Sequence, residues 1–261
     1  MIKQTYLSPH LVIDIGNTKI GGAVFAGDEL IMKFRFRRSA HWTEELSRSL
    51  IHCGKLSGAL VSSVFPAINP TVMQMLSSLK IPVTFVEDLK LTIDNHGHNV
   101  GSDRLADAYG VMKLHPGNAI TIAVGTALVF NVIKGNAFYG GAICPGMGMG
   151  LRALAEHCAL LPLVEITKPT VVCSNETEGN MRSGIYYGLL GTIERLIKEL
   201  KHECFADSTA CVVMTGGLFS GTQGESTILG TQLKRDLGNI VDHLEVDLTS
   251  IGLNEIYKKH L

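Results

Sequence analysis

The sequence lacks the patterns that mark disulfide-rich or zinc-binding proteins. Its six cysteines form no Cys-x-x-Cys pair and have no regular spacing, so we expect reduced, mostly buried thiols in a cytosolic protein. Its ten histidines are scattered, and no pair of them stands at metal-ligand spacing beside a cysteine. A zinc site is therefore not expected.

Charge of one sign and long apolar runs are also absent. A formal net charge of −1 provides no global field for nucleic acid or an anionic membrane. No uninterrupted apolar run reaches the roughly 18 residues of a membrane helix. The first ten residues lack the long apolar core of a signal peptide. We therefore expect a cytoplasmic protein that binds neither nucleic acid nor membrane.

What the sequence has is enough apolar material for a large core, arranged in a pattern that occurs twice. Hydrophobic residues make up 46% of 261, which suffices for one large core or two of about half that size. Three strands followed by helices and further strands occur first before residue 115 and again after residue 118. This repetition predicts two related α/β domains with a cleft between them. Strands are predicted at 11–16, 20–26, 29–37, 59–64, 83–86, 119–124, 127–133, 137–143 and 211–215, and helices at 42–53, 70–79, 104–114, 148–157, 182–203, 226–237 and from 253.

One loop pattern lies at the start of each half. Residues 11–25 and 119–133 each read as an apolar strand, a turn built on glycine and threonine, and a second apolar strand. Two such turns can hold a phosphate chain with backbone N–H groups and hydroxyls. The two copies differ at one position, because Asp14 of the first corresponds to Ala123 of the second.

The first turn has the composition of a phosphate and metal loop. Gly16 permits a close backbone approach, Asn17 and Thr18 can donate hydrogen bonds to phosphate oxygens, and Asp14 can orient a hydrated Mg²⁺. The alternative is an ordinary hairpin turn. The second copy of the pattern favours the functional interpretation.

Three further motifs could contribute to the same chemistry. Asp103, in the segment 101–104, is either the N-cap of the following helix or a general base, with Arg104 restraining it or meeting phosphate. The paired turns at 140–141 and 145–146 are either structural or a backbone surface that faces a ligand. The glycines of 215–217 would let an adenine ring lie close to the backbone.

Together these motifs resemble the type III pantothenate kinases, of the actin, sugar-kinase and heat-shock-ATPase superfamily. The match is spread over almost the whole chain, and its order and spacing are specific. The matching segments are Asp14-x-Gly-Asn-Thr18, Gly101-x-Asp-Arg104, Gly125-Thr-Ala127, Gly140-Gly-Ala-Ile-x-Pro-Gly146, Ala153-Leu154, Leu161-Pro162, Thr177, Ser183-Gly184, Thr215-Gly-Gly217 and Asp247-Leu-Thr-x-x-Gly-Leu253.

The resemblance implies two ribonuclease H-like α/β domains with a central interdomain cleft. An N-terminal phosphate-binding domain would span 1–116, and a C-terminal domain with the second phosphate loop and the nucleotide floor would span 117–261. Such enzymes transfer the γ-phosphate of ATP to the primary hydroxyl of pantothenate, the first step towards coenzyme A. They use Mg²⁺ or another divalent cation, and many use K⁺ or NH₄⁺. They are homodimers whose substrate pocket borrows residues from the neighbouring subunit.

The resemblance also implies roles for individual residues. Asp103 would be the catalytic base for the pantothenate hydroxyl, and Asp14 would hold Mg²⁺ through water. ATP and its phosphates would be bound by Asp14, Gly16, Asn17, Thr18, Lys19, Thr126, Gly216 and Gly217, and pantothenate by Gly101, Ser102, Arg104 and Thr177.

The chain departs from the family pattern in three places. The usual second loop reads Asp-x-Gly-Thr-Ala-x-Thr-x-Asp, but here Ala123 and Asn131 replace its two acids. Ala123 keeps no ligand atom, and Asn131 keeps only a neutral oxygen. We therefore expect reduced activity and a weak or altered monovalent-cation site. The loop 94–100 has His96-Gly-His98 where Tyr or Pro is often found.

Two other functions are compatible with these residues. A degenerate family member would keep the fold and ligand binding, with little turnover, as a binding or regulatory protein. A sugar kinase of the ROK type shares the opening glycine-rich loop. However, such kinases have glycine in place of Asn17, a cysteine-rich zinc motif and an acidic sugar-binding helix, so this alternative ranks below the other two.

Overall fold

The computed structural model describes residues 8–39, 41–95, 99–206, 208–219 and 227–261. The chain divides into two compact units. Unit 1 contains the described residues up to Leu114 and those from Asp247 onward, and unit 2 contains those from His115 to Val246. The loop with His96 and His98 lies outside the described residues.

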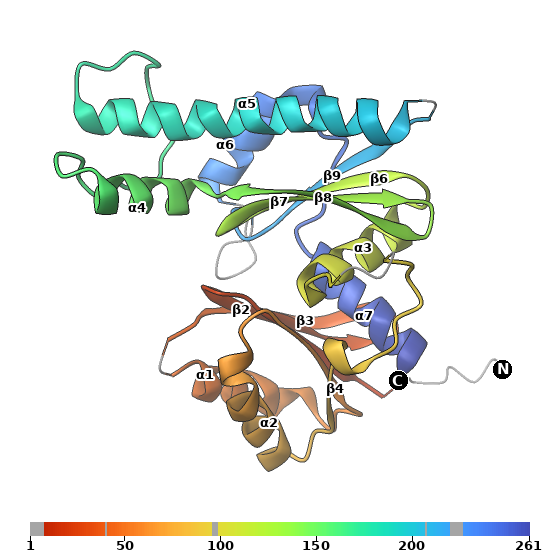
Figure 1. The fold of residues 1–261 in the computed structure, drawn as a ribbon. Coiled ribbons are helices and arrows are strands. Elements are labelled where there is room, and N and C mark those ends of the chain that lie inside the picture. The colour runs from red at the N-terminus through yellow and green to blue at the C-terminus, as the bar shows by residue number, and fades with distance from the viewer. Residues whose placement is uncertain (1–7, 40, 96–98, 207, 220–226) are drawn as a thin grey trace. The chain divides into compact units, whose positions relative to one another are not determined.

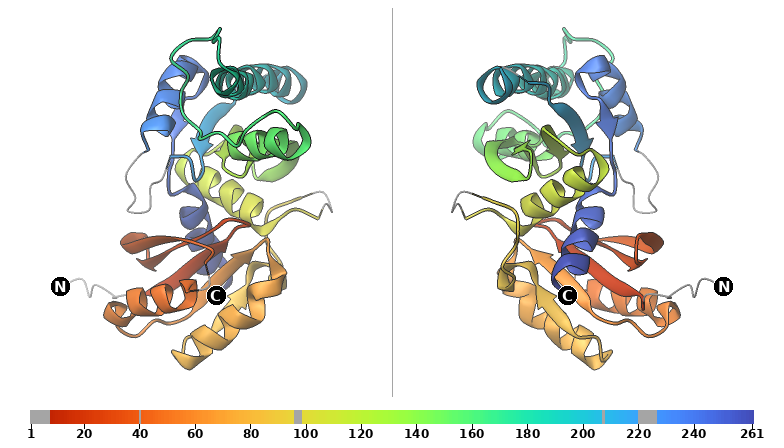
Figure 2. Two further views of the ribbon diagram at one scale, coloured as in Figure 1. Left: turned by 90° about the vertical axis from the view of Figure 1, so that its left-hand side faces the viewer. Right: turned by 90° about the vertical axis from the view of Figure 1, so that its right-hand side faces the viewer.

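Unit 1 is a five-stranded sheet with helices on both faces (Figures 1 and 2). The strand order is β3-β2-β1-β4-β5, in which β1 pairs antiparallel with β2 and parallel with β4. Its elements are β1 (His10–Ile15), β2 (Lys19–Ala26), β3 (Glu29–Arg37), α1 (Trp42–Leu50), β4 (Ala59–Ser63), α2 (Asn69–Ser78), β5 (Val83–Phe85), α3 (Ser102–Leu114) and α7 (Leu248–His260), with 3₁₀ turns at Ile51–Cys53, Pro66–Ile68 and Val86–Asp88.

Unit 2 repeats this sheet. The order β8-β7-β6-β9-β10 has the same pairing pattern, with β6 antiparallel to β7 and parallel to β9. Its elements are β6 (Ala119–Val124), β7 (Ala127–Lys134), β8 (Ala137–Pro145), α4 (Met147–His157), α5 (Thr177–Phe205), β9 (Cys211–Thr215), α6 (Ile228–Leu237) and β10 (His243–Leu244), with a 3₁₀ turn at Gly238–Ile240.

The two sheets also share a β-bulge at matching positions. The register of β2 with β3 shifts between Val24 and Phe25, and that of β7 with β8 shifts between Val132 and Ile133. These positions correspond once the second turn is taken as one residue shorter than the first. The predicted pair of related α/β domains is therefore confirmed at the level of strand order and local distortion.

Alternation along the strands separates the two faces of the unit 1 sheet. Leu11, Ile13 and Ile15 of β1 are fully buried in a core that includes residues of α1 and α2. The intervening residues point to the opposite face, where α3 and α7 lie side by side (Figure 2). Gly252 is required at this crossing, because a Cβ there would lie 1.7 Å from the Ala106 carbonyl oxygen.

The last helix is the main difference from the expected division at 116/117. The sequence pattern assigned residues 117–261 to one domain, but α7 belongs to unit 1. The physical reason is that Leu248, Leu253 and Ile256 are fully buried on a helix that packs against α3 and β1. Hydrophobic periodicity identifies such a face but not its partner.

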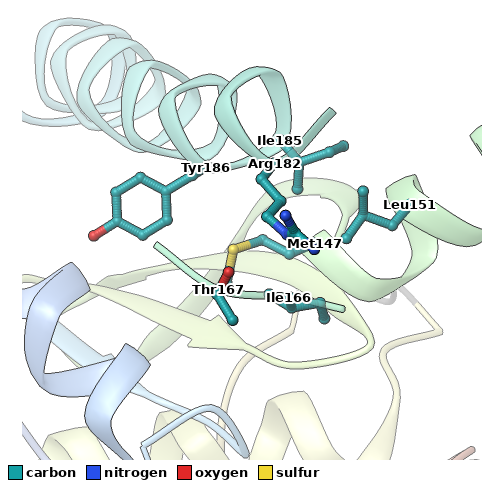
Figure 3. A pocket seen from close by; sticks show the side chains of 7 residues that line it. All are labelled: Met147, Leu151, Ile166, Thr167, Arg182, Ile185 and Tyr186. Carbon is teal, nitrogen blue, oxygen red and sulfur yellow. The ribbon is translucent and has the colours of Figure 1, made fainter. Parts of the chain in front are cut away.

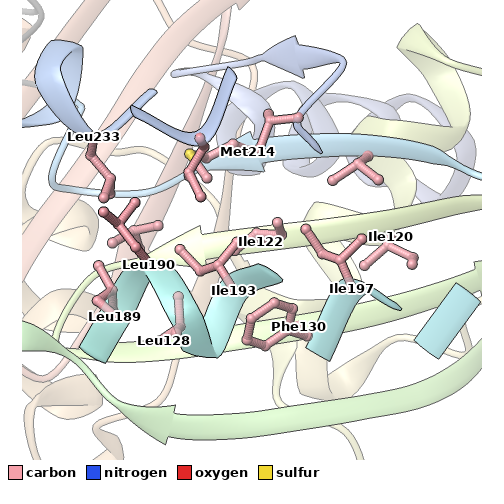
Figure 4. Close-up of a cluster of buried hydrophobic side chains, with 14 of the residues drawn as sticks. Ile120, Ile122, Leu128, Phe130, Leu189, Leu190, Ile193, Ile197, Met214 and Leu233 are labelled. Atoms are coloured by element: carbon pink, nitrogen blue, oxygen red, sulfur yellow. The ribbon is translucent and has the colours of Figure 1, made fainter. Parts of the chain in front are cut away.

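The core of unit 2 lies between its sheet and α5 and α6 (Figure 4). Ile193 and Ile197 of α5 are buried against strand residues such as Phe130. The apolar face of the predicted helix 182–203 therefore covers the core of its own unit. Among the described helices, none combines the length and apolar character needed to span a bilayer.

Candidate functional site

The first glycine-rich loop is a tight hairpin in unit 1. The Gly16 N–H donates to the Lys19 carbonyl oxygen at 3.0 Å, which closes a turn over Asn17 and Thr18. Asn17 and Thr18 are both exposed. The polar side chains predicted to donate to phosphate are thus presented to solvent at the end of β1.

Asp14 stands at the base of this loop, opposite a basic strand. It pairs in register with Gly21 of β2, and Gly21 pairs with Arg35 of β3. Because Gly21 has no side chain, the charges of Asp14 and Arg35 interact across it. Burial and the negative charge of Asp103 nevertheless raise the pKa of Asp14 to about 7, against smaller lowering effects of Ser62 and Arg35.

Arg35 was not predicted as a site residue, although the sequence carries a signal for it. Lys33, Arg35 and Arg37 alternate along β3 and therefore share one face of the strand. Burial, followed by the charges of Arg35 and Arg37, lowers the pKa of Lys19. This accumulation of cations beside the loop suits an anionic ligand.

A chain of hydroxyls connects Asp14 to the start of α3. The Ser62 hydroxyl lies 3.3 Å from Asp14 Oδ1 and 3.0 Å from Ser102 Oγ. Ser102 Oγ also accepts from the Ser63 N–H at 3.2 Å and donates to Glu87 at 3.1 Å. Ser102, predicted to bind pantothenate, is buried and holds β4 and α3 together instead of facing solvent.

Asp103 is the second residue of α3 and half-buried. Its Oδ1 accepts from the Arg104 N–H at 2.8 Å. Gly101 leaves room for this geometry, since a Cβ there would lie 2.7 Å from that oxygen. Burial raises the pKa of Asp103, against lowering by the Arg104 N–H and guanidinium. The Asp103 carboxylate therefore accepts a hydrogen bond from one backbone N–H near the helix start. Its pKa is shifted upward, towards neutral pH.

A third carboxylate, Asp107, was not singled out from the sequence. It is 4% exposed, one turn along α3 from Asp103, and accepts from the Thr249 hydroxyl of α7 at 2.6 Å. Burial raises its pKa to about 8, and the charges of Asp103 and Asp14 add to the shift. Asp14, Asp103 and Asp107 thus form an acidic cluster, in which the negative charge of one carboxylate disfavours the ionisation of another.

The acidic cluster has the chemistry expected of a divalent-cation site. Carboxylate oxygens are the preferred ligands of Mg²⁺, and clustered carboxylates with raised pKa values are the arrangement that a cation stabilises. Asp14 and Asp103 are half-buried, so both remain within reach of solvent. The residues of unit 1 therefore fit the predicted Mg²⁺.

The second loop lies in unit 2, where three glycine segments meet. The Gly146 N–H donates to the Thr126 carbonyl oxygen at 3.0 Å, and a Cβ on Gly146 would lie 2.2 Å from the Gly125 oxygen. Gly216 has φ of +112°, and a Cβ there would lie 2.5 Å from the Val124 nitrogen. Because α4 begins directly after Gly146, its N-terminal N–H groups lie beside this loop.

The two altered positions of the second loop share one face of the sheet. Ala123 pairs with Val129, and Thr121 pairs with Asn131, on the face opposite the core strand residues. Asn131 is fully buried, and its Nδ2 donates to the Thr121 hydroxyl at 3.0 Å. The amide that replaces the family's acid is thus bonded within its own sheet.

Thr177 is exposed as the first residue of α5. Farther along α5, a recess faces α4 and the segment 166–167, and Arg182 and Tyr186 are among the side chains that line it (Figure 3). The side chains that line it leave no space for a water molecule. The recess is therefore closely packed.

The family model and the curated relatives agree on one family. A family model described as type III pantothenate kinase matches residues 10–199. The type III pantothenate kinase of Elusimicrobium minutum is 36% identical over 226 residues, covering 80% of this chain and 87% of that protein. The type III pantothenate kinase of Frankia alni is 32% identical, covering 96% and 99%.

Solved structures confirm the architecture. A ROK family glucokinase from Streptomyces griseus superposes with a TM-score of 0.54 at 13% identity, over 97% of this chain and 100% of that one. At this identity the likeness concerns the fold alone. With the family match over most of its length, the chain belongs to the type III pantothenate kinase family.

Proposed function

We propose that this chain transfers the γ-phosphate of ATP to the primary hydroxyl of pantothenate. Family membership supports the reaction, and the observation that carries it to particular residues is the acidic cluster beside the phosphate loop of unit 1. Phosphoryl transfer requires positioning of the reactants and neutralisation of charge more than covalent chemistry. The acidic cluster, which would bind the cation, and the basic strand β3 beside it meet this requirement.

Asp103 accepts the proton of the pantothenate hydroxyl in this proposal. A general base works best when its pKa lies near the working pH, and burial moves the pKa of Asp103 in that direction. The Arg104 N–H fixes one carboxylate oxygen, so the other is directed to the acceptor. Gly101 allows this orientation, and Arg104 restrains the acceptor or its phosphate.

The loop of Asn17, Thr18 and Lys19 would hold the triphosphate in unit 1. Its donors are exposed, and Arg35 adds a positive charge that the sequence motif does not include. Asp14 would orient Mg²⁺ through water, and the ion would neutralise charge on the transferred group. In unit 2, Thr126 and the N-terminus of α4 would meet phosphate, while Gly216 and Gly217 would let adenine approach the backbone.

A homodimer in the cytoplasm completes the proposal, with Thr177 contributing to the pantothenate site. The apolar face of α5 does not support this, because it is buried in unit 2. The support is instead an exposed apolar surface on the edge strand β8, where Tyr139 is 50% and Ile143 is 62% exposed. Such a surface favours association with a second chain.

The decisive experiment is an assay of the purified protein with ATP, Mg²⁺ and pantothenate, following the pantothenate phosphate ester. The proposal expects ester formation that stops when Mg²⁺ is chelated. Binding of ATP and pantothenate without any ester would establish the degenerate binding protein instead. Phosphorylation of a hexose and not of pantothenate would establish the ROK-type alternative.

The altered second loop predicts weak dependence on K⁺ or NH₄⁺. Ala123 supplies no ligand, and Asn131 is bonded to Thr121. The double change Ala123→Asp and Asn131→Asp restores both acids on one face of the sheet. We expect it to raise turnover in K⁺ or NH₄⁺ relative to Na⁺. Strong K⁺ activation of the unchanged protein would contradict the role assigned to Asn131.

A further inference from the structure

A group of side chains of the types that ligate metals lies in unit 2, away from the loop that contains Gly125. His115, Cys211 and His243 each present a ligand atom, and these atoms lie within 4.8 Å of one another. His115 precedes β6, and the other two begin the parallel strands β9 and β10. We call these residues the His–Cys–His triad. Sequence separations of 96 and 32 residues explain why no metal spacing was visible.

The triad has the ligand types of a zinc-like transition-metal site. Two imidazoles and a thiolate match the preference of Zn²⁺ and Co²⁺, whereas Mg²⁺ prefers oxygen. Tetrahedral coordination with bonds of about 2.0–2.3 Å needs ligand atoms roughly 3.5 Å apart. The ligand atoms therefore need to approach one another by at most about 1.3 Å. The exposed His243 can supply much of this movement by side-chain rotation.

The two histidine rings are already adjacent. Their centroids lie 4.1 Å apart with an interplanar angle of 22°. Glu245 Oε1 lies 3.0 Å from His115 Nε2. A carboxylate on one imidazole nitrogen fixes the ring and leaves the other nitrogen for a metal, as in many zinc sites. Glu245 is therefore a positioning residue for His115.

The charges around Cys211 favour a cation. The carboxylates of Asp242 and Glu245 and the ammonium group of Lys201 all interact electrostatically with Cys211. Two negative charges thus lie near the sulfur with one positive charge. A bound dication would offset the repulsion between the two carboxylates.

We propose that His115, Cys211 and His243 bind one Zn²⁺-like transition-metal ion, with Glu245 orienting His115 and solvent completing the coordination. The ion would tie the residue where the chain enters unit 2 to the first residues of β9 and β10. The site lies at the opposite end of β6 and β9 from Gly125 and Gly216, roughly 15 Å away by strand length. It is therefore structural and separate from phosphate binding.

Titration of the purified full chain with Co²⁺ in excess Mg²⁺ tests this site directly. Mg²⁺ occupies oxygen-rich sites, and the thiolate-to-cobalt charge-transfer band reports a cysteine ligand specifically. We expect one Co²⁺ per chain with this band, displaced by one Zn²⁺. We also expect Zn²⁺ to raise the midpoint of thermal unfolding.

Three variants and a control assign the ligands. Cys211→Ser should abolish the charge-transfer band, and His243→Gln, at an exposed position, should weaken Co²⁺ binding at least about tenfold. Glu245→Gln should weaken it about 10–100-fold while keeping the band. Cys204→Ser, at another partly buried cysteine of unit 2, should change nothing. No band in the unchanged protein, or a band that survives both Cys211→Ser and His243→Gln, would overturn the proposal.

Discussion

Replacing Asp107 with asparagine should make unit 1 less sensitive to alkaline pH. Burial holds the pKa of this carboxyl at about 8, far above its ordinary value of 3.8. Between these two values the unfolded chain releases the proton and the folded protein keeps it. The folded state then binds more protons, so its stability falls as pH rises from about 4 to about 8. Asparagine removes this proton while still accepting the Thr249 hydroxyl.

The size of the effect follows from linkage. One proton difference costs about 1.4 kcal/mol per pH unit, so three units give an upper bound of about 4 kcal/mol. Neighbouring carboxylates share protons with Asp107, which reduces this figure. We therefore expect the loss of stability between pH 5.5 and 8.5 to be smaller in Asp107→Asn by roughly 1–3 kcal/mol.

The single tryptophan provides the assay. Trp42 is buried in the core of unit 1, so its fluorescence during urea unfolding reports this unit. Asp88→Asn is the matched control, because it makes the same chemical change at an exposed position of unit 1. Equal pH dependence in the unchanged protein and Asp107→Asn would refute the reasoning. So would stability that rises between pH 5.5 and 8.5 in the unchanged protein and falls in the variant.

Three further predictions concern the catalytic residues, the second loop and assembly. Asp103→Asn should lower kcat about 10²–10⁴-fold in the coupled kinase assay with little change in pantothenate Kd, because the amide cannot accept a proton; near-normal kcat would leave Asp103 only a structural role at the helix start. Gly146→Ala should lower the thermal midpoint and weaken ATP binding by calorimetry, since its Cβ would lie 2.2 Å from the Gly125 oxygen; unchanged values would show that the loop shifts freely. Light scattering at micromolar concentration should give a dimer, and Ile143→Lys, on exposed β8, should shift it towards monomer; a stable monomer of the unchanged chain would exclude a shared pocket.

Local patterns predicted most of the fold. Alternation and turn glycines placed the strands at 29–37, 119–124 and 211–215 with the bounds that the structure shows. Helix ends were predicted less well: α1 ends at Leu50 instead of 53, and α5 begins at Thr177 instead of 182. No side chain caps the N-terminus of α5 with a hydrogen bond. Apolar periodicity alone therefore does not locate where this helix begins.

The residues that sequence analysis missed depend on contacts between distant segments. Asp107 gains its role from α7, which returns from the far end of the chain. Arg35 reaches Asp14 only because Gly21 lies between them in register. The motif residues of unit 1, by contrast, were visible because Asp14 and Asp103 each stand in a short, recognisable segment. Their assigned roles remain predictions.

The return of α7 to unit 1 has a consequence for biosynthesis. The residues of unit 2 precede residues 247–261 in the chain and are therefore synthesised before them. The α3 surface around Ala106 and Gly110 stays uncovered until α7 has been synthesised and packs onto it. At about 5–20 residues per second, synthesis of residues 247–261 takes about 1–3 s. A chain truncated before residue 247 would keep the residues of unit 2 but leave Asp107 without the Thr249 hydroxyl and this surface of α3 uncovered.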